Sequence, residues 1–222
     1  MGLRERFWSG MARQLGEPKG WRGRILGRGL NRGNRAVITA AVLAVGVQRG
    51  DDAADLGFGG GAGLQLLLDR VEQNGHVYGV DLSAAMLQAA RRRFRDECSV
   101  GRMTLHQGSM LDLPLTDDSL DAVITVNTVY FVDDLAATFA EVSRTLRPGG
   151  RVAVGIGDPE AMASMPHTGS GFRLRPLDEI RAELEGVGLK EVRHERVGEG
   201  SGAAHLLTGQ LPFAHPPNPP SG

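Results

Sequence analysis

The stretch "ADLGFGGGAG", residues 54–63, decides the fold of this chain. Five of its ten residues are glycine, and Asp55 stands two places before the first of them. Glycine gives up side-chain burial and loses more backbone entropy than other residues on folding. Such a stretch therefore indicates a need for bare backbone, which a bound nucleotide, a phosphate group or a tight turn would each explain.

On either side of this stretch, short apolar runs alternate with helical patterns. The expected strands cover residues 53–56, 77–80, 103–106, 122–126, 151–156, 190–196 and 204–208. Helical patterns cover 36–45, 134–146 and 176–188, begin near Leu64 and Ser83, and give a helical or mixed segment near Asp112. Alternation of this kind predicts an α/β fold, with a mostly parallel sheet covered by helices on both faces.

The length and the charge distribution suggest one domain with a basic extension. The chain has 222 residues and a formal net charge of -1, yet residues 1–35 hold nine Lys or Arg against two Glu. Residues 3–15 show the apolar periodicity of a short amphipathic helix. We predict a basic N-terminal lid segment over 1–35, one domain over 36–211, and a disordered Pro-rich tail over 212–222.

Several classes of protein are disfavoured by the composition. Cys98 is the single cysteine, so an internal disulfide or a cysteine cluster for zinc or iron–sulfur is excluded. No run approaches the ~20 apolar residues of a membrane span, and the start of the chain lacks the apolar core of a secretory signal. We expect a cytoplasmic protein that binds neither nucleic acid nor membrane, and we allow for a homodimer.

The glycine stretch falls where an open parallel sheet binds its ligand, at the carboxyl end of the first strand. Gly57, Gly59 and Gly61 would let a ligand approach the main chain, while a helix from Ala62 would offer its free N–H groups. The same letters also fit the G-x-G-x-x-A pattern of a nicotinamide-dependent oxidoreductase, and glycine turns occur without any ligand.

Two acidic residues narrow the choice of cofactor. Asp81 ends the second expected strand, twenty residues beyond Gly61, where a carboxylate can accept both ribose hydroxyls of NAD or S-adenosylmethionine. The alternative is that Asp81 only caps the helix near Ser83. Asp55 would repel a pyrophosphate but favour a cofactor with an ammonium and a sulfonium; its alternative role is a hydrogen bond to the loop backbone.

Taken in order, these residues resemble the class I S-adenosylmethionine-dependent methyltransferases, in particular those of ubiquinone and menaquinone biosynthesis. The matching segments are "DLGFGGG", "GVDLSAAMLQAARRR", "HQGSMLDLPLTDDSLDAVIT" and "EVSRTLRPGGRVAV". The resemblance implies a Rossmann-like, doubly wound sheet of seven strands with the last antiparallel, N-terminal lid helices, and S-adenosyl-L-methionine as cofactor. The alternatives are an NAD(P)-dependent oxidoreductase and a non-catalytic binding module.

The resemblance also implies a set of cofactor-binding residues. The turn would wrap the amino-acid end, Asp81 would hold the ribose, and two further segments would meet the adenine and the methionine. The residues are Asp55, Gly57, Phe58, Gly59, Gly61, Asp81, Leu82, Met86, Ser109, Met110, Asn127 and Thr128. The family often has an acid where this chain has Ser109, whose hydroxyl is a weaker partner for the adenine amino group.

The chemistry of methyl transfer makes catalytic residues hard to find in a sequence. In-line transfer from a sulfonium needs alignment first, and a general base only where the acceptor loses a proton. We name Tyr130 and His167 as candidates, against a buried aromatic with a satisfied hydroxyl and a surface histidine. Asp133 and Asp134 are interpreted as helix-start residues and no metal is predicted. The acceptor is expected to be a small apolar or aromatic metabolite.

Overall fold

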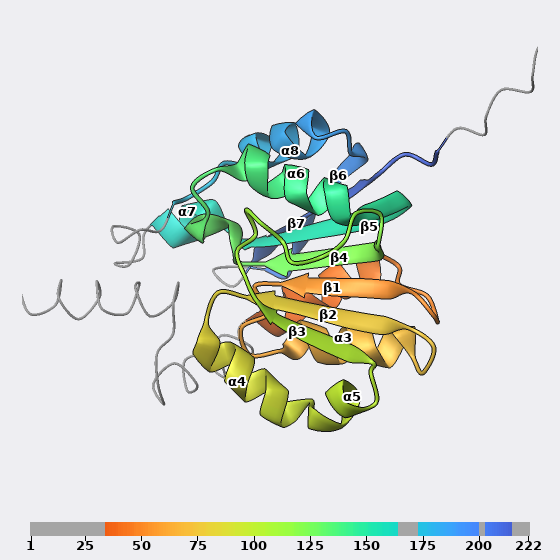
Figure 1. The fold of residues 1–222 in the computed structure, drawn as a ribbon. Coiled ribbons are helices and arrows are strands. Elements are labelled where there is room, and N and C mark those ends of the chain that lie inside the picture. The colour runs from red at the N-terminus through yellow and green to blue at the C-terminus, as the bar shows by residue number, and fades with distance from the viewer. Residues whose placement is uncertain (1–33, 164–172, 200–202, 215–222) are drawn as a thin grey trace, which may run out of the picture.

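The computed structural model describes residues 34–163, 173–199 and 203–214 of the chain (Figure 1). Within them seven strands form one sheet in the order β3-β2-β1-β4-β5-β7-β6. The strands are β1 (Asp52–Leu56), β2 (His76–Asp81), β3 (Met103–Gln107), β4 (Leu120–Val126), β5 (Leu146–Gly157), β6 (Lys190–Val197) and β7 (Ala204–Gln210). The first five are parallel, and β7 is antiparallel to both β5 and β6. The predicted doubly wound, mostly parallel sheet is confirmed.

Helices cover both faces of the sheet. They are α3 (Ala62–Val71), α4 (Ala84–Arg93), α5 (Arg95–Ser99), α6 (Leu135–Thr145), α7 (Pro159–Ala163), α8 (Leu177–Gly186), a 3-10 turn η1 (Val129–Phe131), and a helix over residues 34–44. Figure 1 shows α6 and α8 together on one face and α3 behind the sheet. In Figure 1 the arrowheads of β1 and β4 point toward the side where α4 begins.

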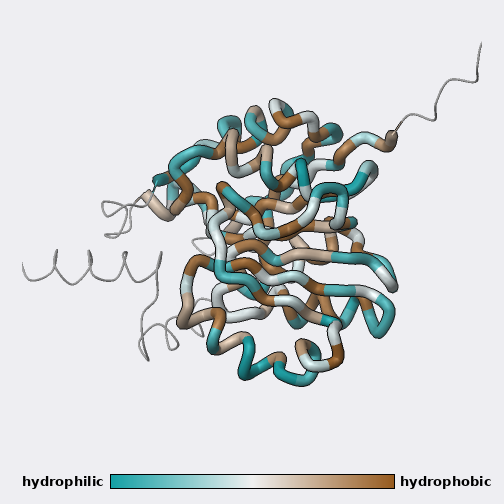
Figure 2. Tube along the Cα trace, in the orientation of Figure 1, coloured by the Kyte–Doolittle hydropathy of each residue, from teal (hydrophilic) through white to brown (hydrophobic). Residues whose placement is uncertain are grey.

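Two cores fill the space between the sheet and its helices. Along β5, Val152 and Val154 pack with α6 and α8, whereas Ala153 between them packs with α3 and the helix over 34–44. Such alternation puts apolar side chains on both faces of each central strand, as a buried parallel sheet requires. Figure 2 accordingly shows hydrophobic segments along the strands inside the molecule. The strands that carry the site are therefore rigidly packed on both sides.

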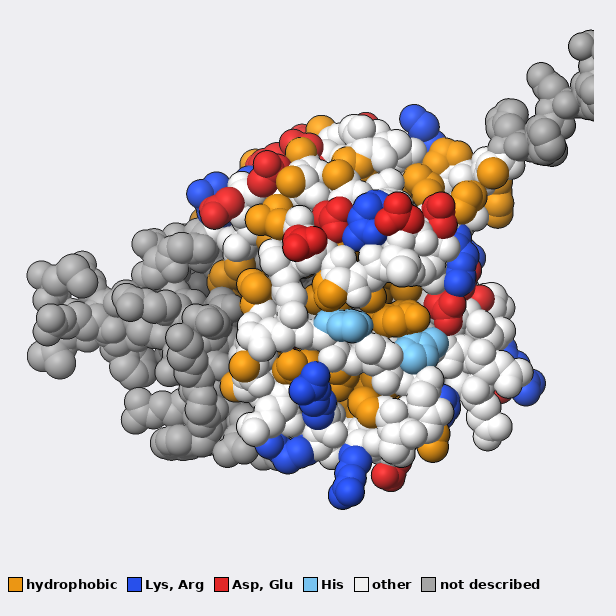
Figure 3. Space-filling model, in the orientation of Figure 1, with side chains coloured by type: hydrophobic (Ala, Val, Ile, Leu, Met, Phe, Trp, Pro, Cys, Tyr) orange, Lys and Arg blue, Asp and Glu red, His pale blue; other side chains and the backbone are white. Residues whose placement is uncertain are grey.

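The helical or mixed segment expected near Asp112 contains no helix. Ser109 and Asp112 form an isolated bridge, and Pro114, which has no N–H, follows at once. This connection therefore leaves the β2 and β3 part of one face without a helix. Figure 3 shows two histidine side chains with hydrophobic side chains between them over this part.

Strand β5 begins at Leu146, not at Arg151 as expected, because "LRPGG" belongs to the strand and not to a turn before it. Main-chain bonds to Leu211 extend the pairing: Leu211 donates to Gly150 O and accepts from Gly149 N–H, each at 2.9 Å. Arg147, in the same segment, pairs with Asp52 and Asp121 of the neighbouring strands. Pairing with residues distant in sequence overrode the local turn signal.

The helix over residues 34–44 is buried on one side only, although its apolar composition predicted burial all round. Val37 and Val42 are buried, whereas Leu43 is 54% exposed. In the part of the chain that the structure describes, no helix is long and apolar enough to cross a membrane. The helix expected over residues 3–15 lies outside the described residues, so it stays a prediction.

Candidate functional site

The carboxyl ends of β1, β2 and β4 meet at one edge of the sheet. Parallel pairing sets Leu56 beside Val80 of β2 and Thr125 of β4. The glycine turn follows directly, and the Gly57 N–H donates to Val80 O at 2.7 Å. The turn therefore lies across the tip of β2, at the edge where open parallel sheets bind their ligands.

Asp81, the last residue of β2, braces the glycine turn. One carboxylate oxygen accepts the Gly59 N–H and the other accepts the Ser83 N–H, each at 2.8 Å. The cap of α4 is Ser83, whose hydroxyl accepts from Met86 N–H. Burial raises the pKa of the Asp81 carboxyl, and its two backbone hydrogen bonds oppose that shift. The capping role weighed for Asp81 thus belongs to Ser83.

The three glycines of the turn share a left-handed backbone conformation but differ in the space around them. Gly57, Gly59 and Gly61 have φ values of 72°, 49° and 73°, which side chains rarely adopt. A Cβ on Gly57 would lie 2.4 Å from Thr128 Oγ1, so no side chain fits there. A Cβ on Gly59 would meet nothing nearer than 4.0 Å. The main chain at Gly59 therefore borders open space that a ligand can occupy.

Asp55 lies beneath the turn and not on its surface. Its side chain is 5% exposed, and a Cβ on Gly63 would stand 2.3 Å from Asp55 Oδ2. Burial raises the pKa of Asp55 to about 8, the neighbouring Asp81 carboxylate adds to the shift, and a hydrogen bond from the Leu64 backbone opposes it. The sequence left open a bond to loop backbone, and the donor in the structure is instead the first turn of α3. A contact with the methionine part stays a prediction.

The raised pKa of Asp55 predicts how stability changes with pH. Between its ordinary value of 3.8 and about 8, the folded protein keeps a proton that the unfolded chain releases. The free energy of unfolding therefore falls as pH rises through this window, by up to about 1.4 kcal/mol per pH unit. We expect Asp55→Asn to remove this part of the slope. Urea denaturation of both proteins across the window measures it, and equal slopes would show that Asp55 does not titrate there.

The predicted adenine residues fall into two groups by exposure. Leu82 is 53% exposed beyond β2, whereas Met86 is 3% exposed in the core under α4. Met110 is also buried, and the Ser109 hydroxyl accepts the Leu111 N–H at 3.1 Å. The Phe58 side chain, assigned to the methionine end, packs in the core at 4% exposure. Contacts of these residues with a cofactor stay predictions.

Asn127 and Thr128 follow β4 and close the other side of the turn. Asn127 has a φ of 56°, and its side-chain oxygen accepts the Gly157 N–H at 3.0 Å. The Thr128 hydroxyl is 3.3 Å from Leu56 O, to which it donates. The structure thus brings Thr128, which follows β4, next to Gly57 of the turn that follows β1.

Tyr130 has the buried position that was the alternative to catalysis. It is 1% exposed, and its hydroxyl accepts the Gly157 N–H at 2.7 Å. Burial raises the pKa of its phenol, and the hydrogen bond with Gly157 opposes the shift only in part. This environment favours a structural role. His167, the other catalytic candidate, lies outside the described residues and stays a prediction.

Asp134 takes the helix-start role expected of it, whereas Asp133 lies one position earlier and forms an ion pair. Asp134 caps α6 by accepting the Ala137 N–H at 2.9 Å, and Asp133 pairs with Arg173 at 2.8 Å. No group of His, Cys, Asp or Glu suited to hold a metal ion occurs among residues 34–163, 173–199 and 203–214.

A cluster that the sequence did not reveal lies just beyond β5. His205 of β7 contacts His194 of β6 at 2.8 Å and Asp158 at 3.4 Å through its two ring nitrogens. Burial lowers the pKa of His194, and the nearby His205 adds to that effect. Both histidines lie 36 or more positions after Asp158 in the sequence. The antiparallel pairing of β6 with β7 joins the two histidines, and the pairing of β5 with β7 brings His205 to Asp158.

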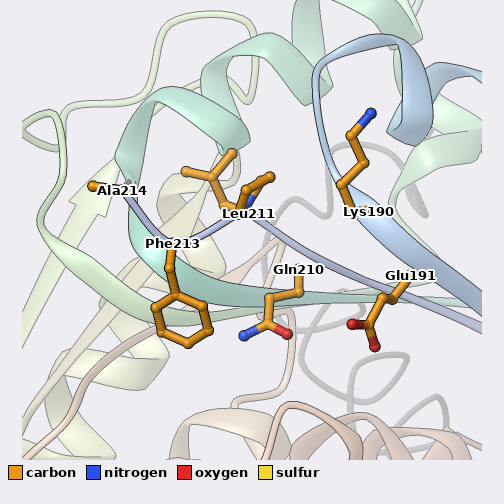
Figure 4. Close-up of a pocket in the computed structure, with 7 residues that line it drawn as sticks. Lys190, Glu191, Gln210, Leu211, Phe213 and Ala214 are labelled. Atoms are coloured by element: carbon orange, nitrogen blue, oxygen red, sulfur yellow. The ribbon is translucent and has the colours of Figure 1, made fainter. Parts of the chain in front are cut away.

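A separate pocket of about 420 Å³ lies at the opposite edge of the sheet (Figure 4). Its lining includes Lys190, Gln210 and Phe213. Gln210 pairs with Arg151, whereas the carboxyl end of β5, Gly157, pairs with Ala204. The pocket is thus separated from the glycine turn by the length of β5, and none of the predicted cofactor residues lines it.

Comparison with known proteins identifies the family. A methyltransferase domain family matches residues 54–154. The uncharacterized methyltransferase YdaC of Bacillus subtilis is 33% identical over 157 residues, which make up 71% of this chain and 84% of YdaC. The chain belongs to the class I S-adenosylmethionine-dependent methyltransferases. Membership of this family removes the nicotinamide-dependent oxidoreductase as an alternative.

Two further proteins resemble this methyltransferase. The 2-phytyl-1,4-naphtoquinone methyltransferase of Trichormus variabilis is 32% identical over 114 residues, 51% of this chain and half of that protein's length. The geranyl diphosphate C-methyltransferase of Streptomyces coelicolor A3(2), solved with Mg²⁺, geranyl diphosphate and S-adenosyl-L-homocysteine, has a TM-score of 0.70 and 20% identity. That match covers 88% of this chain and 86% of the other. The structural likeness shows a shared fold.

The residues of the turn fit S-adenosylmethionine, the cofactor of this methyltransferase. The Gly59 main chain borders open space, so a ligand can approach it closely. The Asp81 carboxylate accepts two backbone N–H groups, and a carboxylate has room for further donors such as ribose hydroxyls. Both features would also suit the ribose and pyrophosphate of a nicotinamide cofactor, so the choice of S-adenosylmethionine rests on the family match.

Proposed function

We propose that this methyltransferase acts on a small apolar or aromatic metabolite or natural-product intermediate. The observation that carries the proposal is a group of partly buried apolar side chains after β4 and β5, namely Phe131, Val132 and Met162. Phe131 and Val132 follow β4, whose end supports the glycine turn, and Met162 follows β5, whose last residue Gly157 donates to Asn127. Binding sites for small molecules are mostly apolar with few polar groups, and this edge of the sheet has that character.

The named relatives support an apolar acceptor. One is named for 2-phytyl-1,4-naphtoquinone, and the structural neighbour was solved with geranyl diphosphate. Both names include an extended hydrocarbon group, which favours the apolar side of the proposal. We also retain the division into residues 1–35, 36–211 and 212–222, a cytoplasmic location consistent with the single Cys98, and a homodimer, as proposals.

In the proposed mechanism the protein aligns two reactants and keeps water away. S-adenosylmethionine supplies a methyl group that its positively charged sulfur already activates for displacement. Asp81 accepts hydrogen bonds from the ribose, and the main chain of the turn, with Asn127 and Thr128, holds the methionine end. Phe131 and Met162 contribute an apolar wall for the acceptor, which excludes water from the reacting atoms.

Proton removal from the acceptor is not assigned to Tyr130. Its hydroxyl is engaged with Gly157, and burial raises its pKa, so it holds its proton at neutral pH. We propose that Tyr130 instead fixes Gly157 beside Asn127, whose side-chain oxygen accepts from the same N–H. His167 stays the proposed base for an acceptor that must lose a proton.

The test of the function is methyl transfer from isotope-labelled S-adenosylmethionine. Purified protein is offered a panel of quinols, phenols and isoprenoids, with polar amino acids and RNA as comparison sets. We expect label in products that partition into organic solvent. Label found only in the polar or RNA sets would overturn the proposed acceptor class.

Phe131→Ala should separate acceptor binding from cofactor binding. Removing the ring takes away apolar contact area, so we expect the acceptor KM to rise roughly tenfold. The Kd of S-adenosylhomocysteine should change less than twofold, because the side chain is assigned to the acceptor side. Phe213→Ala is the matched control, since Phe213 is 72% exposed and lines the pocket at the opposite edge. Equal KM values in the two variants would contradict the assignment.

A further inference from the structure

The connection between β3 and β4 contains two of the predicted adenine residues and forms no helix of its own. It runs over residues 108–119 and includes Ser109 and Met110. Gly108 N–H donates to Asp81 O at 3.2 Å, which fixes the start of the connection to the tip of β2. Within the rest, Asp112 N–H donates to Ser109 O at 3.4 Å and Leu115 N–H donates to Leu113 O at 2.7 Å. Other peptide groups of the connection take partners from outside it, since buried peptide groups without partners are costly.

These partners come from one side of α6. The Leu113 N–H donates to Glu141 Oε2 at 2.9 Å, and Leu113 O accepts from Arg144 at 3.2 Å. Arg144 also donates to Leu115 O at 2.9 Å. Both polar groups of Leu113 are therefore held by a single pair of side chains one helical turn apart.

The pair is itself rigidly built. Arg144 donates from two nitrogens to the two oxygens of Glu141, at 2.9 and 2.8 Å, in the bidentate geometry that fixes both planes. Asp117 adds a second carboxylate at 2.5 Å from Arg144. The hydrogen bond from Arg144 lowers the pKa of Glu141, so the pair is charged at neutral pH. Figure 3 shows acidic and basic side chains side by side next to α6.

The pair is not needed to hold α6 on the sheet. That helix is anchored by Phe139 and Val142, both fully buried in the core. The hydrogen bonds of Glu141 and Arg144 go instead to the 108–119 connection. A comparable ion-pair group, Arg147 with Asp52 and Asp121, joins strands at the opposite edge and touches no predicted cofactor residue.

We propose that Glu141 and Arg144 are positioning residues. They hold the 108–119 connection in the conformation in which Ser109 and Met110 contact the adenine ring. They act through Leu113 and Leu115 and do not touch the cofactor. The inference rests on the predicted adenine role of Ser109 and Met110 and is independent of the acceptor, so failure of the proposed acceptor class would leave it unaffected.

The test compares two ligands that differ only at the adenine edge. Calorimetry measures the Kd of S-adenosylhomocysteine and of S-inosylhomocysteine, in which oxygen replaces the adenine amino group. We expect the wild-type protein to prefer the adenine compound by about tenfold, the usual scale for one hydrogen bond. Arg144→Lys keeps the positive charge but cannot form the bidentate contact with Glu141, and Glu141→Gln removes the negative charge. Each variant should reduce this preference to about twofold or less.

Arg147→Lys is the matched control, because it disturbs an ion pair of similar exposure without touching the connection. It should lower the melting temperature but keep the tenfold preference. Hydrogen exchange gives a second readout: the Leu113 amide should exchange roughly tenfold faster in the Arg144 and Glu141 variants than in the control. Unchanged ligand preference in those two variants, or equal wild-type affinity for both ligands, would overturn the proposal.

Discussion

Asp81→Ala is expected to weaken binding of S-adenosylmethionine on the order of 100-fold. The Asp81 carboxylate accepts the Gly59 and Ser83 N–H groups at 2.8 Å each, and we assign the ribose hydroxyls to its remaining acceptor positions. The variant loses the carboxylate that binds the ribose and also the hydrogen bond that fixes the Gly59 N–H of the turn. Hydrogen bonds to a charged group contribute about 1.5–3 kcal/mol each, and two of them account for this loss. Calorimetry with the purified protein measures it.

Two controls separate the ribose role from general destabilisation. Asp81→Asn keeps the shape and one oxygen but removes the charge, so we expect an intermediate loss of about tenfold. Asp52→Ala removes a carboxylate that pairs with Arg147 at the other end of the sheet, at 2.7 Å. It should lower stability and change the Kd less than twofold. A loss in Asp52→Ala as large as in Asp81→Ala would withdraw the ribose assignment.

The sheet was predictable because its strands are short apolar runs with clear boundaries. "AVITV" in β4 is buried on both faces, and in "VYGV" of β2 only Tyr78 is partly exposed, so apolar composition located both strands. The start of β5 was missed because Gly149 and Gly150 gain main-chain partners from Leu211, some sixty residues away. The residues that indicate a turn at this position carry no information about pairing with a distant segment. The segment near Asp112 was expected to be helical or mixed, and it contains no helix because side chains of α6 bind its peptide groups.

The site was predictable where its geometry is local. Gly57, Gly59 and Asp81 are separated by one helix and the second strand of a strand–turn–helix–strand unit. Their spacing in the sequence was therefore enough to predict that they lie close together. The burial of Asp55 was not predictable, because it depends on the absence of a side chain at Gly63. Pairs such as Asp158 with His205 arise only from strand register. Long-range pairing therefore marks the limit of what the sequence alone could show.

Gly57→Ala is expected to lower the free energy of unfolding by about 3 kcal/mol. The residue has a φ of 72°, and an added Cβ would approach Thr128 Oγ1 to 2.4 Å and Thr128 Cγ2 to 2.6 Å. The first effect strains the backbone and the second pushes Thr128 away from Leu56 O, to which its hydroxyl donates. A drop of this size corresponds to a fall in melting temperature of roughly 6–12 °C for a domain of this size.

Gly101→Ala is the matched control, because Gly101 has a φ of 74° and an added Cβ there would meet nothing within 4 Å. It isolates the backbone strain, about 1 kcal/mol. Thr128→Ala in the Gly57→Ala background removes both atoms that clash, so the double variant should recover part of the loss beyond additivity. Equal destabilisation in the Gly57 and Gly101 variants would show that the bare backbone is needed only for its left-handed conformation and that close packing against Thr128 plays no part.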